Sequence, residues 1–175
     1  LRKYLAYKYA QLRPGGALLI RDVVGPEDGE EEILAWFNSE NGVTPESRSV
    51  KDVPVQELSS LGRFYRFAQE FFNGRGVEYQ EVDIRGKHYI SLKRKDAADF
   101  LSKKEYVDNW DSELHEDFTH WSFSQWKEEL ERIGFSLDEA QSRSYANDWI
   151  IENFLTGTAE LYRQEGDTLV PEEFP

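Results

Sequence analysis

The stretch "LRPGGALLIRDVVGPE", residues 12–27, decides the prediction of the fold. Pro14 cannot continue a helix, and the two glycines after it supply the backbone freedom that a sharp turn from helix to strand needs. Residues 17–24 then form an apolar run without alternation, interrupted by only two charges, which is typical of a parallel strand buried on both faces. Helix, glycine turn and buried strand make half of a doubly wound repeat, so the sequence predicts an α/β fold.

The segments after this stretch and before it add four predicted helices and a hairpin. Apolar residues at helical spacing predict helices over residues 1–12 and 56–72, and acids placed before an apolar run predict a third over residues 27–37. A short helix is expected over residues 96–104. A period near two on both sides of a central Arg-Gly pair predicts a hairpin over residues 79–92.

The last third of the chain is predicted to hold one more helix and two strands. Ser122, with a glutamine three residues later, fits a capping box that opens a helix, and Gly134 fits its C-terminal end. Residues 136–145 and 158–163 are predicted strands.

The composition excludes several classes of protein. The 175 residues are 39% hydrophobic and include no cysteine, so we expect one globular domain, residues 1–175, without disulfides and in the cytoplasm. No apolar run reaches the roughly 18 residues that cross a bilayer, so no membrane span is expected. A net charge of −13 disfavours nucleic acid as a partner, because affinity for the phosphate backbone comes from Lys and Arg.

Three motifs carry a resemblance: "LRPGGALLIRDVV", "WSFSQWKEELERIGF" and "TGTAELYRQ". Together they resemble the C-terminal half of a class I S-adenosylmethionine-dependent methyltransferase. In that family a helix that ends in a Pro-Gly-Gly turn leads into the fifth strand, and a late W-x-x-x-L-x-x-x-G-F helix precedes a final antiparallel strand pair. The resemblance covers residues 1–25 and 119–163. It implies that residues 26–118 are an inserted helical and hairpin cap on the substrate side of a doubly wound, Rossmann-like sheet.

The resemblance implies a function as well as a fold. S-adenosylmethionine would be the cofactor, and the methyl acceptor would be a small molecule or a protein. The family's glycine-rich loop and its ribose-binding acid have no counterpart in this chain, which also lacks Met and begins inside a predicted helix. We therefore expect a fragment whose partner is a missing N-terminal half, and weak or no cofactor binding by these residues alone. A non-catalytic, acidic interaction or regulatory domain of the same topology is the alternative.

Asp22 is the first catalytic candidate, because it lies near the carboxyl end of the predicted strand, where α/β sheets bind ligands. It would orient or deprotonate the methyl acceptor, unless it serves as a local cap or pairs with Arg21. Arg63 and Arg66 share one face of a predicted helix and suit an anionic group of the substrate; the alternative is a solvated basic face. Tyr145 would face the site from a strand end or act as a structural tyrosine.

The stretch "YVDNWDSELHEDFTHW", residues 106–121, concentrates aromatic residues and two histidines. A substrate lid would use His120 or His115 as a general base and the aromatic rings to exclude water. Ordinary packing of the cap onto the core is the alternative. A metal site is disfavoured, because histidines five residues apart do not share one helical face. The substrate-binding candidates in this stretch are Tyr106, Trp110, His115 and Trp121.

Overall fold

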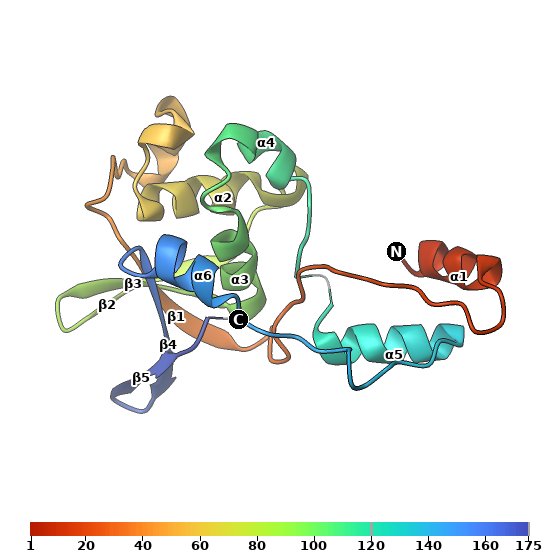
Figure 1. Cartoon of the computed structure of the whole chain (residues 1–175). Helices are drawn as coiled ribbons and strands as arrows, with labels where there is room; N and C mark the ends of the chain where they lie inside the picture. Colours follow the sequence, from red (N-terminus) through yellow and green to blue (C-terminus); the bar gives the residue numbers. More distant parts are fainter. Residues whose placement is uncertain (120, 175) are drawn as a thin grey trace.

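The computed structural model describes residues 1–119 and 121–174 of the chain and is built around a sheet (Figure 1). The sheet has five strands in the order β2-β3-β1-β4-β5, and every neighbouring pair is antiparallel. The mixed α/β class is confirmed, whereas this sheet is not the doubly wound parallel sheet that the sequence predicts. Its strands are β1 (Glu32–Phe37), β2 (Tyr79–Ile84), β3 (Lys87–Lys93), β4 (Ala159–Glu165) and β5 (Thr168–Glu172).

The central strand β1 lies where the sequence predicts a helix over residues 27–37, so that prediction is wrong. β1 pairs with β3 on one edge and with β4 on the other, and Ile33, Leu34, Ala35 and Phe37 are all buried. A strand with buried residues on both faces has a continuous apolar run, which periodicity alone does not distinguish from a short buried helix. The hairpin of β2 and β3, in contrast, is confirmed.

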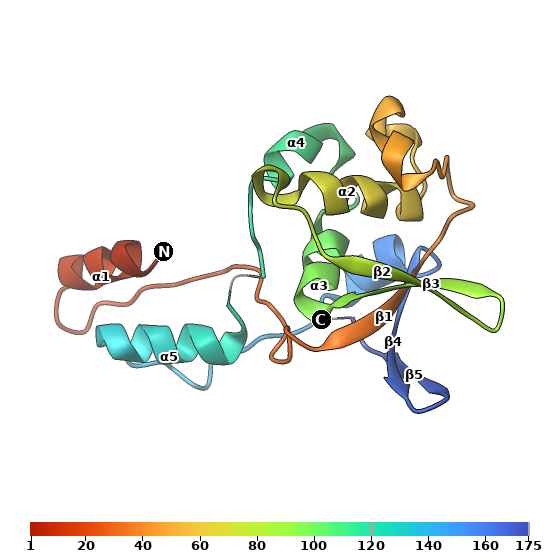
Figure 2. The same cartoon turned by 180° about the vertical axis from the view of Figure 1, so that it is seen from behind.

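Helices α2 (Ser60–Gly74) and α3 (Arg94–Lys103) pack on one face of the sheet and confirm two predicted helices (Figure 2). The core between them is aromatic, because the Phe37 ring centroid lies 4.9 Å from that of Phe64 and 5.0 Å from that of Phe100. All three rings are buried. The shorter helical turns of this part are η1 (Ser47–Asp52), η2 (Val55–Glu57), η3 (Val107–Asn109), α4 (Trp110–Glu113), α6 (Asp148–Ile150) and η4 (Ile151–Leu155).

A second, smaller part consists of α1 (Arg2–Gln11) and α5 (Phe123–Ile133), which pack against each other away from the sheet (Figures 1 and 2). Leu5 of α1 is buried against Trp121 and Trp126. Both helices are predicted by the sequence and are confirmed. Among the described helices, none is both long and apolar enough to cross a membrane.

Residues 17–24, the predicted buried strand, pair with no strand of the described residues, so the structure does not confirm this prediction. In Figure 1 they run as an extended trace from the end of α1 back along α5. Leu18 and Val24 pack against the cluster between the two helices, whereas Leu19 is 93% exposed. A parallel strand needs a hydrogen-bonded strand beside it, and none of the described strands lies beside this segment.

Of the two strands predicted near the end of the chain, one is confirmed and one is wrong. β4 covers most of residues 158–163 and pairs with both β1 and β5. Residues 136–145 form turns and irregular chain, because no described strand pairs with them. The edge strand β5 is not predicted by the sequence. It contains Pro171, which an edge strand tolerates because one of its two edges needs no ladder hydrogen bond.

A buried ion pair ties α3 to the chain that leads towards α5. Asp99 and Lys103 lie one turn apart on α3 and form an ion pair, with side chains that are 2% and 0% exposed. The hydroxyl and the backbone N–H of Thr119 also donate to Asp99 Oδ2, at 2.8 and 3.3 Å. The Lys103 ammonium lies 3.6 Å from the centre of the Phe118 ring. These contacts hold the chain before α5 against the sheet part.

Asp99→Ala is expected to lower the free energy of unfolding by about 3–5 kcal/mol, because it leaves a buried ammonium without its counter-charge. Urea denaturation followed by tryptophan fluorescence measures the loss. As a control, Lys127→Ala removes a cation whose partner Glu139 is exposed, and it is expected to change stability little. Equal effects of the two substitutions would contradict the structural role assigned to Asp99.

Candidate functional site

A cleft of about 450 Å³ lies between the sheet part and the α1–α5 part. One wall consists of residues 26–31. They follow directly after Gly25, which itself follows the extended segment 17–24. The other walls come from Arg75, from α3 and from the chain that enters α5. These walls contribute Lys95, Asp96, Asp99, Asp117, Thr119, Ser122 and Gln125 to the lining.

Two of the connections between the parts, near Gly25 and near Thr119, touch beside this cleft. The Gly25 N–H donates a hydrogen bond of 2.9 Å to the Trp121 carbonyl. A Cβ atom on Gly25 would lie 2.7 Å from the Thr119 carbonyl oxygen, so only glycine lets the two backbones approach this closely. We call this contact of Gly25 with Thr119 and Trp121 the crossing.

Glu27 fastens the N-terminus of α5 to the crossing. The Ser122 hydroxyl donates to its Oε2 atom at 2.8 Å, and the Ser124 N–H donates to Oε1 at 2.9 Å. Ser122 also forms the predicted capping box with Gln125, which is thereby confirmed. Burial by itself would raise the pKa of Glu27, but the hydrogen bonds from Ser124 and Ser122 outweigh it, so the pKa is lowered. A carboxylate at this helix end also meets the positive end of the helix dipole.

Carboxylates dominate the lining of the cleft. Among the described residues, seven acidic ones line it, against two basic ones, Arg75 and Lys95. Hydrogen bonds from Lys93 and Lys95 lower the pKa of Glu30 to about 2. Burial raises the pKa of Asp96, which forms no hydrogen bond or ion pair within the described residues. A lining of this sign disfavours polyanionic ligands.

Of the two catalytic candidates from the sequence, only Asp22 lies within the described residues. Asp22 is exposed on the extended segment, and it is not among the described residues that line the cleft. The Val23 N–H donates to its Oδ1 atom at 2.9 Å, which is the local cap that the sequence leaves open as the alternative. His120 lies outside the described residues. A catalytic role for either residue stays a prediction.

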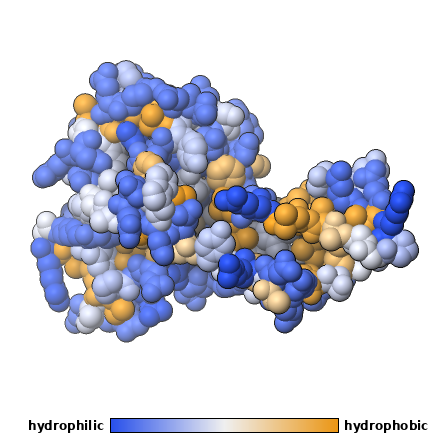
Figure 3. Space-filling view, viewed as in Figure 1, coloured by the Kyte–Doolittle hydropathy of each residue, from blue (hydrophilic) through white to orange (hydrophobic). Residues whose placement is uncertain are grey.

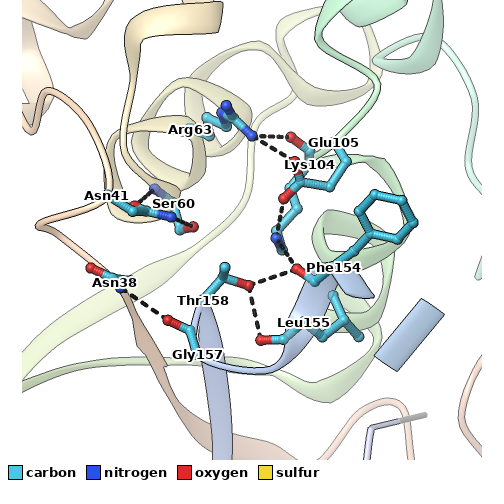
Figure 4. A network of polar contacts seen from close by, with 10 residues as sticks. All are labelled: Asn38, Asn41, Ser60, Arg63, Lys104, Glu105, Phe154, Leu155, Gly157 and Thr158. Carbon is cyan, nitrogen blue, oxygen red and sulfur yellow. Dashed lines mark hydrogen bonds and ion pairs between the residues drawn. The ribbon is translucent and has the colours of Figure 1, made fainter. Parts of the chain in front are cut away.

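Arg63 and Arg66 are engaged by neighbours within the sheet part. Arg63 Nη1 donates at 3.0 Å to the Lys104 carbonyl and at 3.0 Å to the Glu105 carboxylate (Figure 4). Arg66 donates at 3.0 Å to the Glu70 carboxylate one turn away. Both guanidinium groups therefore make contacts that stabilise the fold, and neither lines the cleft in the part of the chain that is described.

Lys104 lies at the centre of the network around Arg63. Its side chain is fully buried and donates at 2.7 Å to the Phe154 carbonyl, besides its ion pair with Glu105 (Figure 4). Burial lowers the pKa of Lys104, although Glu105 opposes the shift. This network fastens η4 to the end of α3.

The described candidates of the predicted lid lie in different parts of the structure. Trp110 is buried in the core of the sheet part, whereas Trp121 belongs to the cluster between α1 and α5. Tyr106 is 53% exposed and His115 is exposed, and neither lines the described cleft. Tyr145, at 72% exposed, does not line it either. The burial of both tryptophans fits the alternative that this stretch packs onto the core. Asp117 and Thr119 of the same stretch, in contrast, line the cleft.

Sequence reasoning missed the residues that the cleft brings together. Glu27 is the first acid after the apolar segment 17–24, so its position beyond the predicted strand was a usable signal. Asp99, which lines the cleft, and its partner Lys103 gave no such signal in the sequence. An acid and a base four residues apart are typical of an exposed helix face. Thr119 is placed by a contact with α3 that depends on the tertiary structure.

Comparisons with protein-family models, curated proteins and solved structures find no match to this chain. Within the described residues, no group of three or more acidic or histidine side chains is arranged to hold a metal ion. The resemblance to methyltransferases stays a hypothesis, and the cleft, its charges and the segment that leads into it are the observations on which a function rests.

Glu27→Gln is expected to lower the urea midpoint at pH 7, because glutamine keeps the shape of the side chain but removes the charge at the helix end. The lowered pKa of Glu27 means that its stabilisation is present above the ordinary value near 4.5 and is lost as the pH falls through the folded-state value. The difference between wild type and variant should therefore shrink towards pH 3.

Glu40→Gln is the matched control for this experiment, because Glu40 is exposed and its carboxylate has no partner within the described residues. It should leave the midpoint unchanged at both pH values. A Glu27→Gln difference that is independent of pH would show that the carboxylate charge does not fasten α5.

Proposed function

We propose that this chain forms the acceptor side of an S-adenosylmethionine-dependent methyltransferase, and that the cleft receives the methyl acceptor. One observation carries the proposal: the cleft begins at Pro26, directly beyond the carboxyl end of the extended apolar segment 17–24 and Gly25. Open α/β sheets bind their ligands beyond the carboxyl ends of their strands.

The extended segment has the features of a sheet strand whose neighbours are not among the described residues. Leu18 and Val24 pack towards α1 and α5, whereas Leu19 and Val23 are 93% and 45% exposed. Successive residues of a strand point to opposite faces, so helices cover one face and the other is bare. Figure 3 shows hydrophobic side chains gathered over this part of the molecule. We propose that further strands of a doubly wound sheet pair with this segment in the complete protein.

The cleft by itself does not fit S-adenosylmethionine. Its described lining holds one glycine, Gly29, and one aromatic ring, Phe71, whereas the adenosyl group calls for a glycine-rich loop and an apolar wall. We therefore assign the cleft to the acceptor and the cofactor to residues beyond this chain. The negative lining favours a cationic or neutral acceptor, a small molecule or a protein side chain, over an anionic one.

Asp96 is better placed than Asp22 to act as a base on the acceptor. Its carboxylate lines the cleft and is free of hydrogen bonds and ion pairs within the described residues. Burial raises its pKa above the ordinary 3.8. A carboxylate with a raised pKa is the stronger base, and proton removal adds to the alignment that methyl transfer chiefly needs.

Methyl transfer from radiolabelled S-adenosylmethionine, measured with the complete gene product, tests this proposal. Asp96→Asn should lower turnover by about 100-fold or more, the usual scale of general base catalysis, with little change in melting temperature. Asp167→Asn, in the turn between β4 and β5, is the matched control and should keep full turnover. A loss of this size in Asp22→Asn alone would assign the base to Asp22 instead.

Two outcomes would contradict the proposal at different points. A folded complete protein that methylates neither amines nor proteins would favour the non-catalytic interaction domain. Calorimetry on the 175-residue chain alone should show weaker binding of S-adenosylmethionine than the complete product shows. Equal affinity would place the cofactor site within these residues and overturn its assignment beyond them.

A further inference from the structure

The face of the sheet that points away from α2 and α3 holds a lysine inside a ring of aromatic side chains. Lys87 Nζ lies 4.4 Å from the centre of the Trp36 ring, 5.5 Å from that of Tyr89 and 5.7 Å from that of Tyr162. It also donates a hydrogen bond of 2.6 Å to Glu160 Oε2. We call these three rings and the Glu160 carboxylate the aromatic cage.

The register of three adjacent strands builds this cage. Trp36 of β1 lies opposite Glu160 of β4, and Leu34, two residues earlier on β1, lies opposite Tyr162. Alternate residues of a strand point to the same face, so these side chains share the outer face while Ala35 and its alternate neighbours enter the core. The β1–β3 pairing brings Tyr89 and Lys87 alongside.

The rings and the carboxylate of the cage are held in place by their neighbours, whereas Lys87 between them is partly exposed. The Tyr89 and Tyr162 rings meet edge to face, with centroids 5.7 Å apart, and Tyr89 is 6% exposed. The Tyr162 hydroxyl donates to Glu160 at 2.5 Å, which fixes the carboxylate. Burial raises the pKa of Tyr162 to about 12, and the bond to Glu160 adds to the shift, so the phenol stays neutral. The Lys87 side chain, in contrast, is 38% exposed, so solvent lies beside it as an alternative to the cage.

A methylated ammonium group has an advantage over Lys87 in such a cage. Ring faces attract cations, and tryptophan attracts them most strongly. A primary ammonium needs hydrogen-bond acceptors for its three N–H groups, and Lys87 has one, Glu160, among the described residues. A trimethylated ammonium carries no N–H, is less strongly hydrated and places methyl groups against the three rings.

We propose that the aromatic cage is a binding site for a trimethyl-lysine side chain of a partner protein, which takes the place of Lys87. The occupant of the cage in the free protein is itself a lysine ammonium group, so the rings and Glu160 already accommodate a cation of this kind. The net charge of −13 favours a basic, lysine-bearing partner. This site is separate from the cleft and does not depend on the proposed methyl transfer.

Lys87 competes with the incoming group from within the same molecule. Because Lys87 is attached to the same chain as the cage, its ammonium group is present at an effective concentration in the millimolar range. Lys87 therefore fills most of the cages at any time, and only the remaining fraction can accept the partner's side chain. The apparent affinity is reduced by that fraction. Lys87→Ala is therefore expected to bind the partner group about 10-fold more tightly than wild type.

Nuclear magnetic resonance of the 175-residue chain tests the proposal. The probe is a capped glycine-flanked peptide with one trimethyl-lysine, and the indole N–H signal of Trp36 is the readout. Titration should move this signal saturably in wild type, about 10-fold more tightly in Lys87→Ala, and with much weaker affinity in Glu160→Gln, which keeps all three rings. Lys127→Ala changes a partly exposed lysine on α5, outside the cage, and is the control that should bind like wild type.

Three results would overturn the assignment. The first is equal affinity in Lys87→Ala and wild type, which would show that the peptide does not enter the cage. The second is equal binding of the same peptide with an unmethylated lysine. The third is tighter binding of choline than of the peptide, which would assign the cage to a small molecule. Trp36→Leu lacks the indole signal, so its binding is followed at the backbone amide of Tyr162, which should no longer shift on titration. The backbone amide spectrum of each variant shows whether the fold is intact.

Discussion

The carboxylate of Asp99 is the constraint on which the arrangement of the molecule depends. It is buried on α3, compensates the charge of Lys103 and accepts two hydrogen bonds from Thr119. Thr119 in turn lies against Gly25 at the crossing, where the chain passes for the second time between the two parts. The cleft owes its walls to this contact, because residues 26–31 and the chain that enters α5 both start from it.

The two proposed sites use different properties of the chain. The cleft depends on the crossing and on an excess of carboxylates, several of which are held by lysines or by the N-terminus of α5. The aromatic cage depends on the register of β1, β3 and β4, and on no residue of the α1–α5 part. Loss of one site is therefore expected to leave the other intact, which makes the two proposals independent.

The sequence predicts those elements that local signals define. The capping box at Ser122 and the glycine at position 134, which has a φ of 116°, mark both ends of α5. The Arg-Gly turn marks the hairpin of β2 and β3, with positive φ at both residues. β1 and residues 17–24 are both apolar runs, and what separates them is the presence or absence of neighbouring strands, which no local signal encodes. For the same reason the cage, formed across three strands, could not be predicted, and neither could the burial of Asp99.

Residue-resolved amide hydrogen exchange of the 175-residue chain tests the central claim, that the two parts meet at the crossing while the apolar segment before it stays unpaired. The Gly25 N–H, which donates to the Trp121 carbonyl, should exchange slowly. The N–H groups of residues 18–21, which donate to no backbone carbonyl of the described residues, should exchange at nearly the rate of an unfolded chain. Fast exchange at Gly25, or protection across residues 18–21 in the chain alone, would contradict this account.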